Sequence, residues 1–149
     1  MSLNQIFDIA GSGMSAQSIR LNTTSSNIAN AETASSSTDE VYRARKPIFQ
    51  AIHQDMMGGG ERGPFGFSEG ELESKGVSVQ GIVESDAELQ MRYQPEHPLA
   101  NEEGYVFYPN VNVVEEMADM MSASRSFQTN VEVMNTAKSM MQRIMTLGQ

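Results

Sequence analysis

Apolar residues recur every three or four positions along the first part of the chain. The alternating steps of four and three pass through Leu3, Phe7, Ala10, Met14, Gln17, Leu21, Thr24 and Ile28. This spacing predicts an amphipathic helix with a heptad seam, interrupted by small and polar residues. A second apolar set widens the face, so we expect this helix to contact more than one neighbour; its members are Ile6, Ile9, Ala16 and Ile19.

The end of the chain repeats this pattern. The same alternation passes through Val113, Met117, Met120, Ser124, Phe127, Val131, Met134, Lys138, Met141 and Met145. Asn112 is a typical N-cap, with Glu115 three residues later in a capping-box arrangement, and Gly148 is a typical helix stop. A second long helix is therefore predicted, again with an apolar face broader than a two-stranded seam requires.

The two helices span roughly 28 and 35 residues, or about 40 and 50 Å, which is long for a domain of this size. Such lengths favour pairing of the two chain ends as a coiled coil. Between them, period-two alternation broken by Gly and Pro predicts a small antiparallel β insertion, with an edge strand or a strand–turn–strand at Pro47 and a bulge at residues 81–83. We expect an α+β fold with an N-terminal helix (1–33), a β-rich insertion (34–110) that contains a mobile Gly-rich loop (about 56–74), and a C-terminal helix (111–149).

Charge and composition exclude several classes of function. The formal net charge of −9 argues against a nucleic-acid partner, because phosphate binding needs clustered Lys and Arg. The chain has no Cys, so neither a disulfide framework nor a thiolate metal site is possible. We expect no cleaved signal peptide, because the N-terminus lacks a basic start and a continuous apolar run.

The sequence also lacks the patterns of catalysis. Around the two histidines, His53 and His97, there is no metal-binding spacing, and the glycines at 58–60 lack the Lys-Ser/Thr of a phosphate-binding loop. Most carboxylates lie in loops or at the start of the second helix, where solvation is their ordinary role. We therefore expect no enzyme activity, no metal, no cofactor and no small-molecule substrate.

Methionine is concentrated in the second helix: seven of the twelve fall between Met117 and Met145. Each of them can fill an ordinary core, but flexible thioethers also adapt to varied partners. Two helices and a small sheet cannot cover apolar stripes this wide, so we expect partner chains to cover the remainder. Gly11 and Gly13 fit either a close approach of another backbone or a local kink.

Several segments resemble the FlgC family of flagellar proximal rod proteins, one branch of the bacterial axial proteins of rod, hook and filament junction. They are SAQSIRLNTTSSNIANAET, YRARKPIF, YQPEHPLANEEGYVFYPNVNVVEEMADMMSASRSFQTNVEVMNTAKSM and the closing LGQ. The Asn27–Asn30 core is common to axial proteins, whereas the block at residues 97–117 is more specific to the rod member. Ser26 and Phe127 depart from the family pattern, which has Asn and Tyr there in many members.

The resemblance implies a structural subunit that leaves through the flagellar type III export apparatus and polymerises across the periplasm into a hollow, torque-transmitting rod. The implied partners are copies of itself, proximal and distal rod subunits, the rod base or MS-ring adaptor, and the export apparatus. We expect the subunit interface to use the apolar residues Leu3, Phe7, Met14, Leu21, Ile28, Met117, Met120, Phe127, Val131, Met134 and Met141. Polar bonds that fix register are expected from Asn22, Asn27, Asn30, Glu116, Arg125 and Asn130.

Two other functions stay open on the residues alone. A secreted helical adaptor could use the Met-rich face to bind clients in discrete complexes. A cell-wall hydrolase would instead need a cleft with a carboxylate pair of perturbed acidity.

The polar segment LNTTSSNIANAET is unusual for the end of an apolar helix. Asn27 and Asn30 lie three apart on one face, and capping or loop entry is their simplest role. The resemblance favours interface amides that select register between subunits, as buried polar residues do in coiled coils. On that interpretation, replacing both with Leu keeps the helix but disturbs assembly.

Overall fold

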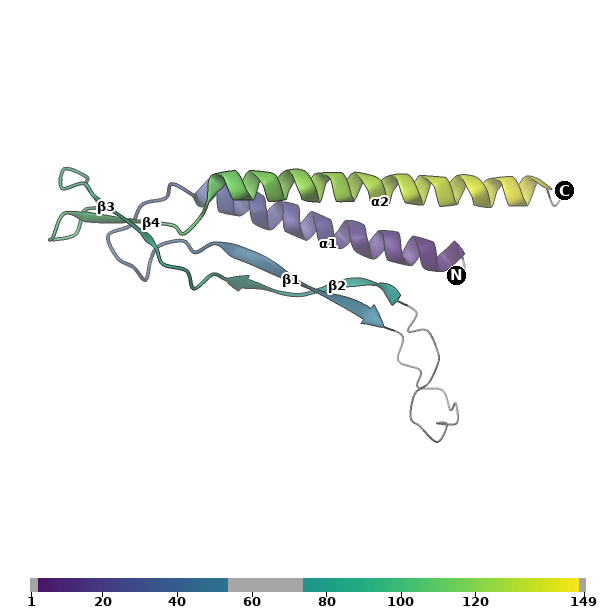
Figure 1. Cartoon of the computed structure of the whole chain (residues 1–149), viewed down its shortest axis with the longest axis horizontal. Helices are drawn as coiled ribbons and strands as arrows, with labels where there is room; N and C mark the ends of the chain where they lie inside the picture. The colour runs from purple at the N-terminus through teal and green to yellow at the C-terminus, as the bar shows by residue number, and fades with distance from the viewer. Residues whose placement is uncertain (1–2, 54–73, 148–149) are drawn as a thin grey trace, which may run out of the picture.

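Two long antiparallel helices lie side by side in the computed structural model, which describes residues 3–53 and 74–147 (Figure 1). The first helix, α1, spans Leu3–Asn30, and the second, α2, spans Val113–Leu147. The predicted N-cap is confirmed, because the side-chain oxygen of Asn112 accepts a bond of 3.2 Å from the amide of Val114. Both termini lie at the same end of the molecule (Figure 1).

The predicted antiparallel β insertion forms two separate two-stranded sheets. The strands β1 (Arg45–His53) and β2 (Ser74–Glu84) make a hairpin, and β3 (Gln90–Tyr93) pairs with β4 (Tyr105–Tyr108). The strand β1 runs through Pro47 without interruption, because each strand of a two-stranded sheet is an edge that tolerates Pro. The predicted bulge is present but falls one residue earlier, at Gln80, between the pairs Ile48–Gly81 and Phe49–Val79. The predicted Gly-rich loop lies largely outside the described residues.

The two sheets occupy different places. The β1–β2 hairpin packs along α1, so α1 contacts both α2 and the hairpin, as its two apolar sets predicted. The β3–β4 sheet extends from the end of the molecule opposite the termini (Figure 1). The linker after α1 is held to this sheet by paired backbone bonds of 3.0 Å between Ser35 and Phe107.

The core is thin and made of small side chains. The buried apolar residues among those described are all Ala or Val: Ala10, Ala16, Val41, Ala44, Val106, Val111, Ala123 and Ala137. Alanine at the helix contact lets two backbones approach closely but contributes little apolar area. Most of the large apolar side chains of this chain are consequently left half-buried or exposed.

One glycine shows how closely the hairpin lies on α1. Gly76 has a φ of 132°, and a Cβ at this position would collide with the Ser12 hydroxyl of α1. That hydroxyl accepts a bond of 3.2 Å from the amide of Val77 and donates one of 2.9 Å to the carbonyl of Ile9. A side chain at position 76 would push the hairpin off the helix.

Candidate functional site

The contact between α1 and α2 contains many of the residues predicted for the subunit interface. Along α2 the residues turned toward α1 are Glu116, Met120, Ala123, Phe127, Asn130, Met134, Ala137 and Met141, all buried or half-buried. Four of them, Met120, Phe127, Met134 and Met141, belong to the predicted seam. Along α1 the predicted residues Phe7, Met14, Leu21 and Ile28 are half-buried, and the side chain of Leu3 lies outside the described residues.

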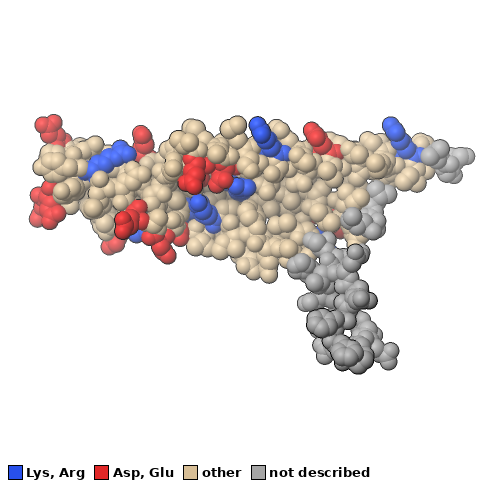
Figure 2. All heavy atoms as spheres, viewed as in Figure 1, with Lys and Arg blue, Asp and Glu red and all other residues tan. Residues whose placement is uncertain are grey.

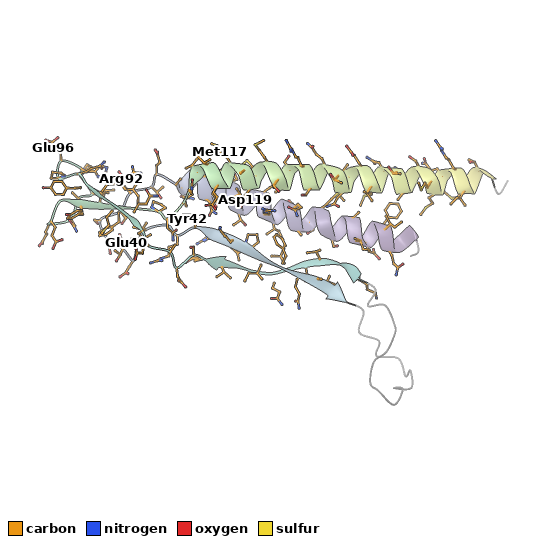
Figure 3. All side chains as sticks on the ribbon, viewed as in Figure 1. Glu40, Tyr42, Arg92, Glu96, Met117 and Asp119 are labelled. Carbon is orange, nitrogen blue, oxygen red and sulfur yellow. The ribbon has the colours of Figure 1, made fainter. Side chains whose placement is uncertain are left out.

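At two positions the side chain that this chain buries is the neighbour of the predicted seam residue, whereas the predicted Ser124 and Val131 are half-buried. Met117 is 51% exposed and points away from α1 (Figure 3), while its neighbour Glu116 is 6% exposed. Likewise Ala137 is buried and Lys138 is exposed. In both pairs the buried position belongs to a small or polar residue, Ala137 or Glu116, which permits close packing of the helices. The subunit contact expected of Met117 stays a prediction.

An ion pair crosses this helix pair. Arg20 Nη2 lies 2.7 Å from Asp119 Oδ1, and their side chains are 26% and 42% exposed. Figure 3 shows Asp119 on the side of α2 that faces α1. Farther along the helix pair, a Cβ on Gly13 would lie 2.8 Å from Asn130 Nδ2. The group that approaches Gly13 closely is therefore the side chain of Asn130, where another backbone was one of the two expectations. The helix runs unbroken through Gly11 and Gly13, so neither marks a kink.

Asn27 occupies a junction where α1 meets the insertion. It is 1% exposed, and its amide nitrogen donates a bond of 2.8 Å to the carbonyl of Arg45. Its amide oxygen accepts bonds from the amide of Arg45 at 3.0 Å and from the hydroxyl of Tyr42 at 2.8 Å. Asn27 is therefore occupied inside its own chain, and in this conformation it does not reach the surface where a second subunit would lie.

Asn110 completes the same junction from the other side. Its amide oxygen accepts a bond of 2.8 Å from the amide of Ala44, and its nitrogen donates to the carbonyls of Ser85 and Ala87 at 3.2 and 2.9 Å. Asn27 and Asn110 thus bind consecutive residues at the start of β1. The junction, which we define as Asn27, Tyr42, Ala44, Arg45, Ser85 and Asn110, ties the end of α1, both ends of the hairpin and the segment before α2 into one unit.

Sequence reasoning missed most of this junction. The sequence pattern singled out Asn27, but the partners of Asn27 lie 15 to 18 residues away in sequence. Asn110 follows Asn27 by 83 residues (110 − 27). No local pattern links such positions. The only available signal was that asparagine is a poor choice for a helix interior unless its amide has a partner.

The remaining predicted polar residues are more accessible. Asn22 and Arg125 are exposed, and Asn30 is half-buried, with its amide nitrogen bonded at 2.8 Å to the carbonyl of Ser26 in its own helix. Their interface roles stay predictions. Within the described ranges, no group of three or more His, Cys, Asp or Glu is placed to hold a metal ion, and no described helix is long and apolar enough to cross a membrane.

Uncovered apolar side chains are the most extensive feature of the surface. On α2 they are Val114 (77% exposed), Met117, Met121, Val133, Met140, Ile144 and Met145. The hairpin adds Ile48, Phe49, Ile52, Val77, Ile82 and Val83, and the β3–β4 region adds Met91, Tyr93, Leu99 and Tyr105. Contiguous exposure of this kind marks surfaces that other molecules cover.

Comparison with known proteins gives these surfaces a context. Residues 7–34 match the family model described as "Flagella basal body rod protein", and residues 102–147 match the model "Flagellar basal body rod FlgEFG protein C-terminal". The chain is 46% identical to the flagellar basal-body rod protein FlgC of Salmonella typhimurium, over the full length of both. It is also 46% identical to FlgC of Escherichia coli O157:H7, again over all of both chains, and 35% identical to that of Borreliella burgdorferi, over all of this chain and 99% of the other.

Proposed function

Because the chain belongs to the FlgC family of flagellar basal-body rod proteins and is a structural subunit of the rod, we propose that it polymerises into a hollow helical segment of the drive shaft. In this proposal the segment transmits torque, spans the periplasm and continues the export channel. The observation that carries it is the set of uncovered apolar side chains along α2, since an isolated subunit gains nothing from exposing Met117, Met121 and Met140. Neighbouring subunits would cover this face by coiled-coil packing.

Torque transmission needs a subunit that does not bend where its parts join. The junction meets this need, because the hydrogen bonds of Asn27 and Asn110 hold consecutive backbone positions of β1 from both sides. A load applied to the hairpin then reaches both helices through bonds that are largely shielded from water, where they are stronger than at the surface. The ion pair between Arg20 and Asp119 adds a second crossing point between the helices.

Assembly on neighbours also accounts for the thin core. Subunits that leave the cell unfolded through the type III apparatus, without a cleaved signal, would need a fold that is easily opened. A core made of Ala and Val suits that need, and contacts with rod neighbours would then supply the missing apolar burial. The partners we propose are copies of this chain, other proximal and distal rod subunits, the rod-base adaptor and the export apparatus. We propose no catalytic role.

The test is incorporation. In cells that lack this chain, an epitope-tagged copy should restore motility and should be recovered in isolated basal bodies at the rod. Recovery only in discrete soluble complexes of fixed stoichiometry would instead support an adaptor that grips clients with the Met-rich face. A cell-wall hydrolase would instead lose motility on alanine replacement of its buried Asp and Glu residues, and intact motility after those replacements would exclude it.

A further inference from the structure

The end of the molecule opposite the termini is acidic. We call residues 86–104, which include β3 and the turn before β4, the tip. It carries five exposed carboxylates, Asp86, Glu88, Glu96, Glu102 and Glu103, and Figure 2 shows acidic side chains gathered at this end. Its one basic residue, Arg92, lies with its guanidinium 4.4 Å from the centre of the Tyr108 ring.

The tip also presents exposed apolar side chains, on β3 and on the turn before β4. Met91 and Tyr93 are 65% and 64% exposed, and Leu99 is 42% exposed. The turn is fixed by Asn101, whose side-chain oxygen accepts bonds from the amides of Glu103 and Tyr105 at 3.1 and 2.8 Å. A turn that is already ordered loses less conformational entropy when it binds.

The last part of α2 has the opposite charge. We call residues 133–147 the open end of α2. Its only charged residues are Lys138 and Arg143, both exposed, and it contains no Asp or Glu. Met140, Ile144 and Met145 are 55%, 59% and 60% exposed. Met140 borders a groove whose apolar lining is Ile6 of α1, Val133 and Ala137 and whose one charged lining residue is Glu132, just before the open end.

We propose that the tip of one copy of this chain docks on the open end of α2 of a second copy. The two surfaces match in both respects, because each carries exposed apolar side chains framed by charges of opposite sign. Since they lie at opposite ends of the molecule (Figure 1), the contact is heterologous and leaves a free tip and a free open end for further copies. The inference rests on the proposed function, because it specifies one contact within the rod.

The charged residues and the apolar residues contribute differently to this contact. Exposed ion pairs contribute about 0–1 kcal/mol each, so the charges mainly steer the encounter and set its direction. Affinity comes from burying the methionines, Ile144 and the aromatic rings. Salt should therefore weaken the contact without abolishing it.

Cross-linking tests the contact in the assembled rod. The chain has no cysteine, so Leu99→Cys and Ile144→Cys each introduce a single thiol at an exposed position. Cells that express both variants should give basal bodies in which a bismaleimide joins two copies of this chain. Cells that express either variant with Asn22→Cys, an exposed position outside both surfaces, should not.

Two results would overturn the proposal. One is the absence of a dimer in basal bodies that contain both variants, and the other is a product between Ile144→Cys and a different rod protein only. In both cases the chain is still in the rod, so the proposed function stands. Absence of the chain from basal bodies would count against the proposed function instead.

Charge exchange gives a second readout on the purified chain. Glu102→Lys with Glu103→Lys, or Lys138→Glu with Arg143→Glu, should each weaken self-association about tenfold in sedimentation at low salt. Mixing the two double variants should restore it, because the reversed tip then meets the reversed open end. Equal association of all samples would contradict the proposal.

Discussion

The junction and the open end of α2 lie at opposite ends of the helix pair and are built in opposite ways. At the junction, Asn27 is 1% exposed and makes three side-chain hydrogen bonds within its own chain. At the open end, Ile144 and Met145 are more than half exposed. The hydrogen bonds of one region are complete in a single subunit, whereas the exposed apolar side chains of the other would be covered only in the proposed assembly.

Because of this difference, we expect the two ends of the helix pair to affect different processes, folding of the subunit at one end and polymerisation at the other. Substitutions at the junction should destabilise the subunit itself, because buried amide and carbonyl groups of the chain lose their partners. Substitutions of exposed residues at the open end should leave the subunit unchanged and act on the rod. The predictions below run from the largest expected change in stability to the smallest.

Asn27→Ala should lower the free energy of unfolding of the purified chain by about 2–4 kcal/mol, because the backbone of Arg45 and the hydroxyl of Tyr42 lose their partner. Urea unfolding followed by circular dichroism measures it. Asn22→Ala is the matched control on the exposed face of the same helix and should change the value by no more than about 0.5 kcal/mol. Equal effects of the two would remove the distinction between a junction asparagine and a surface one.

Ala123→Leu should cost about 1–3 kcal/mol, because its side chain is 0% exposed between the helices and a larger one forces them apart. The control is Ala118→Leu, an exposed alanine five residues earlier in α2, which should be close to neutral. The same urea experiment compares them. A neutral Ala123→Leu would mean that the helices are not closely packed at this position.

Gly11→Ala should stabilise the purified chain by about 0.5–1 kcal/mol, because the helix gains propensity and a Cβ there meets nothing within 4 Å. Gly13→Ala should gain less, since its Cβ meets the Asn130 amide, and adding Asn130→Ala should restore the gain. Thermal unfolding at equal concentration gives the ranking. A larger gain from Gly13→Ala than from Gly11→Ala would contradict the close contact.

Met140→Ser combined with Ile144→Ser should change the unfolding free energy of the purified chain by less than about 0.5 kcal/mol, because more than half of each residue is already exposed. The same variant should fail to restore motility and should be depleted from isolated basal bodies. Gln142→Ser, an exposed polar position between them, is the control and should behave as the unchanged chain. Normal rods from the double variant would show that the open end is not an interface.

The fold was largely predictable because its signals are local. The 4–3 alternation and the Asn112 cap located both helices, and period-two alternation located the strands. The seam was half right: Met120, Phe127, Met134 and Met141 face α1, but Glu116 and Ala137 take the places expected of Met117 and Lys138. Apolar periodicity cannot find a contact whose inward positions are small or charged.

The role of Asn27 was the least predictable feature. Local rules allowed a cap, and the family resemblance favoured a contact between subunits, but the structure places it in a bond network inside the chain. Its partners come from a segment that the fold alone brings close. Replacing Asn27 and Asn30 with Leu would therefore disturb the subunit before it disturbs assembly, and Asn30→Leu alone is the cleaner test of an interface amide.

Amide hydrogen exchange on the purified chain and on isolated rods tests the central claim most directly, since it reads local stability along both helices. In the purified chain, amides of α1 and α2 near the junction should exchange slowly and those of residues 133–147 quickly. In the rod, residues 133–147 should become as protected as the junction. Uniform protection along α2 in the purified chain, with no change on assembly, would contradict the account.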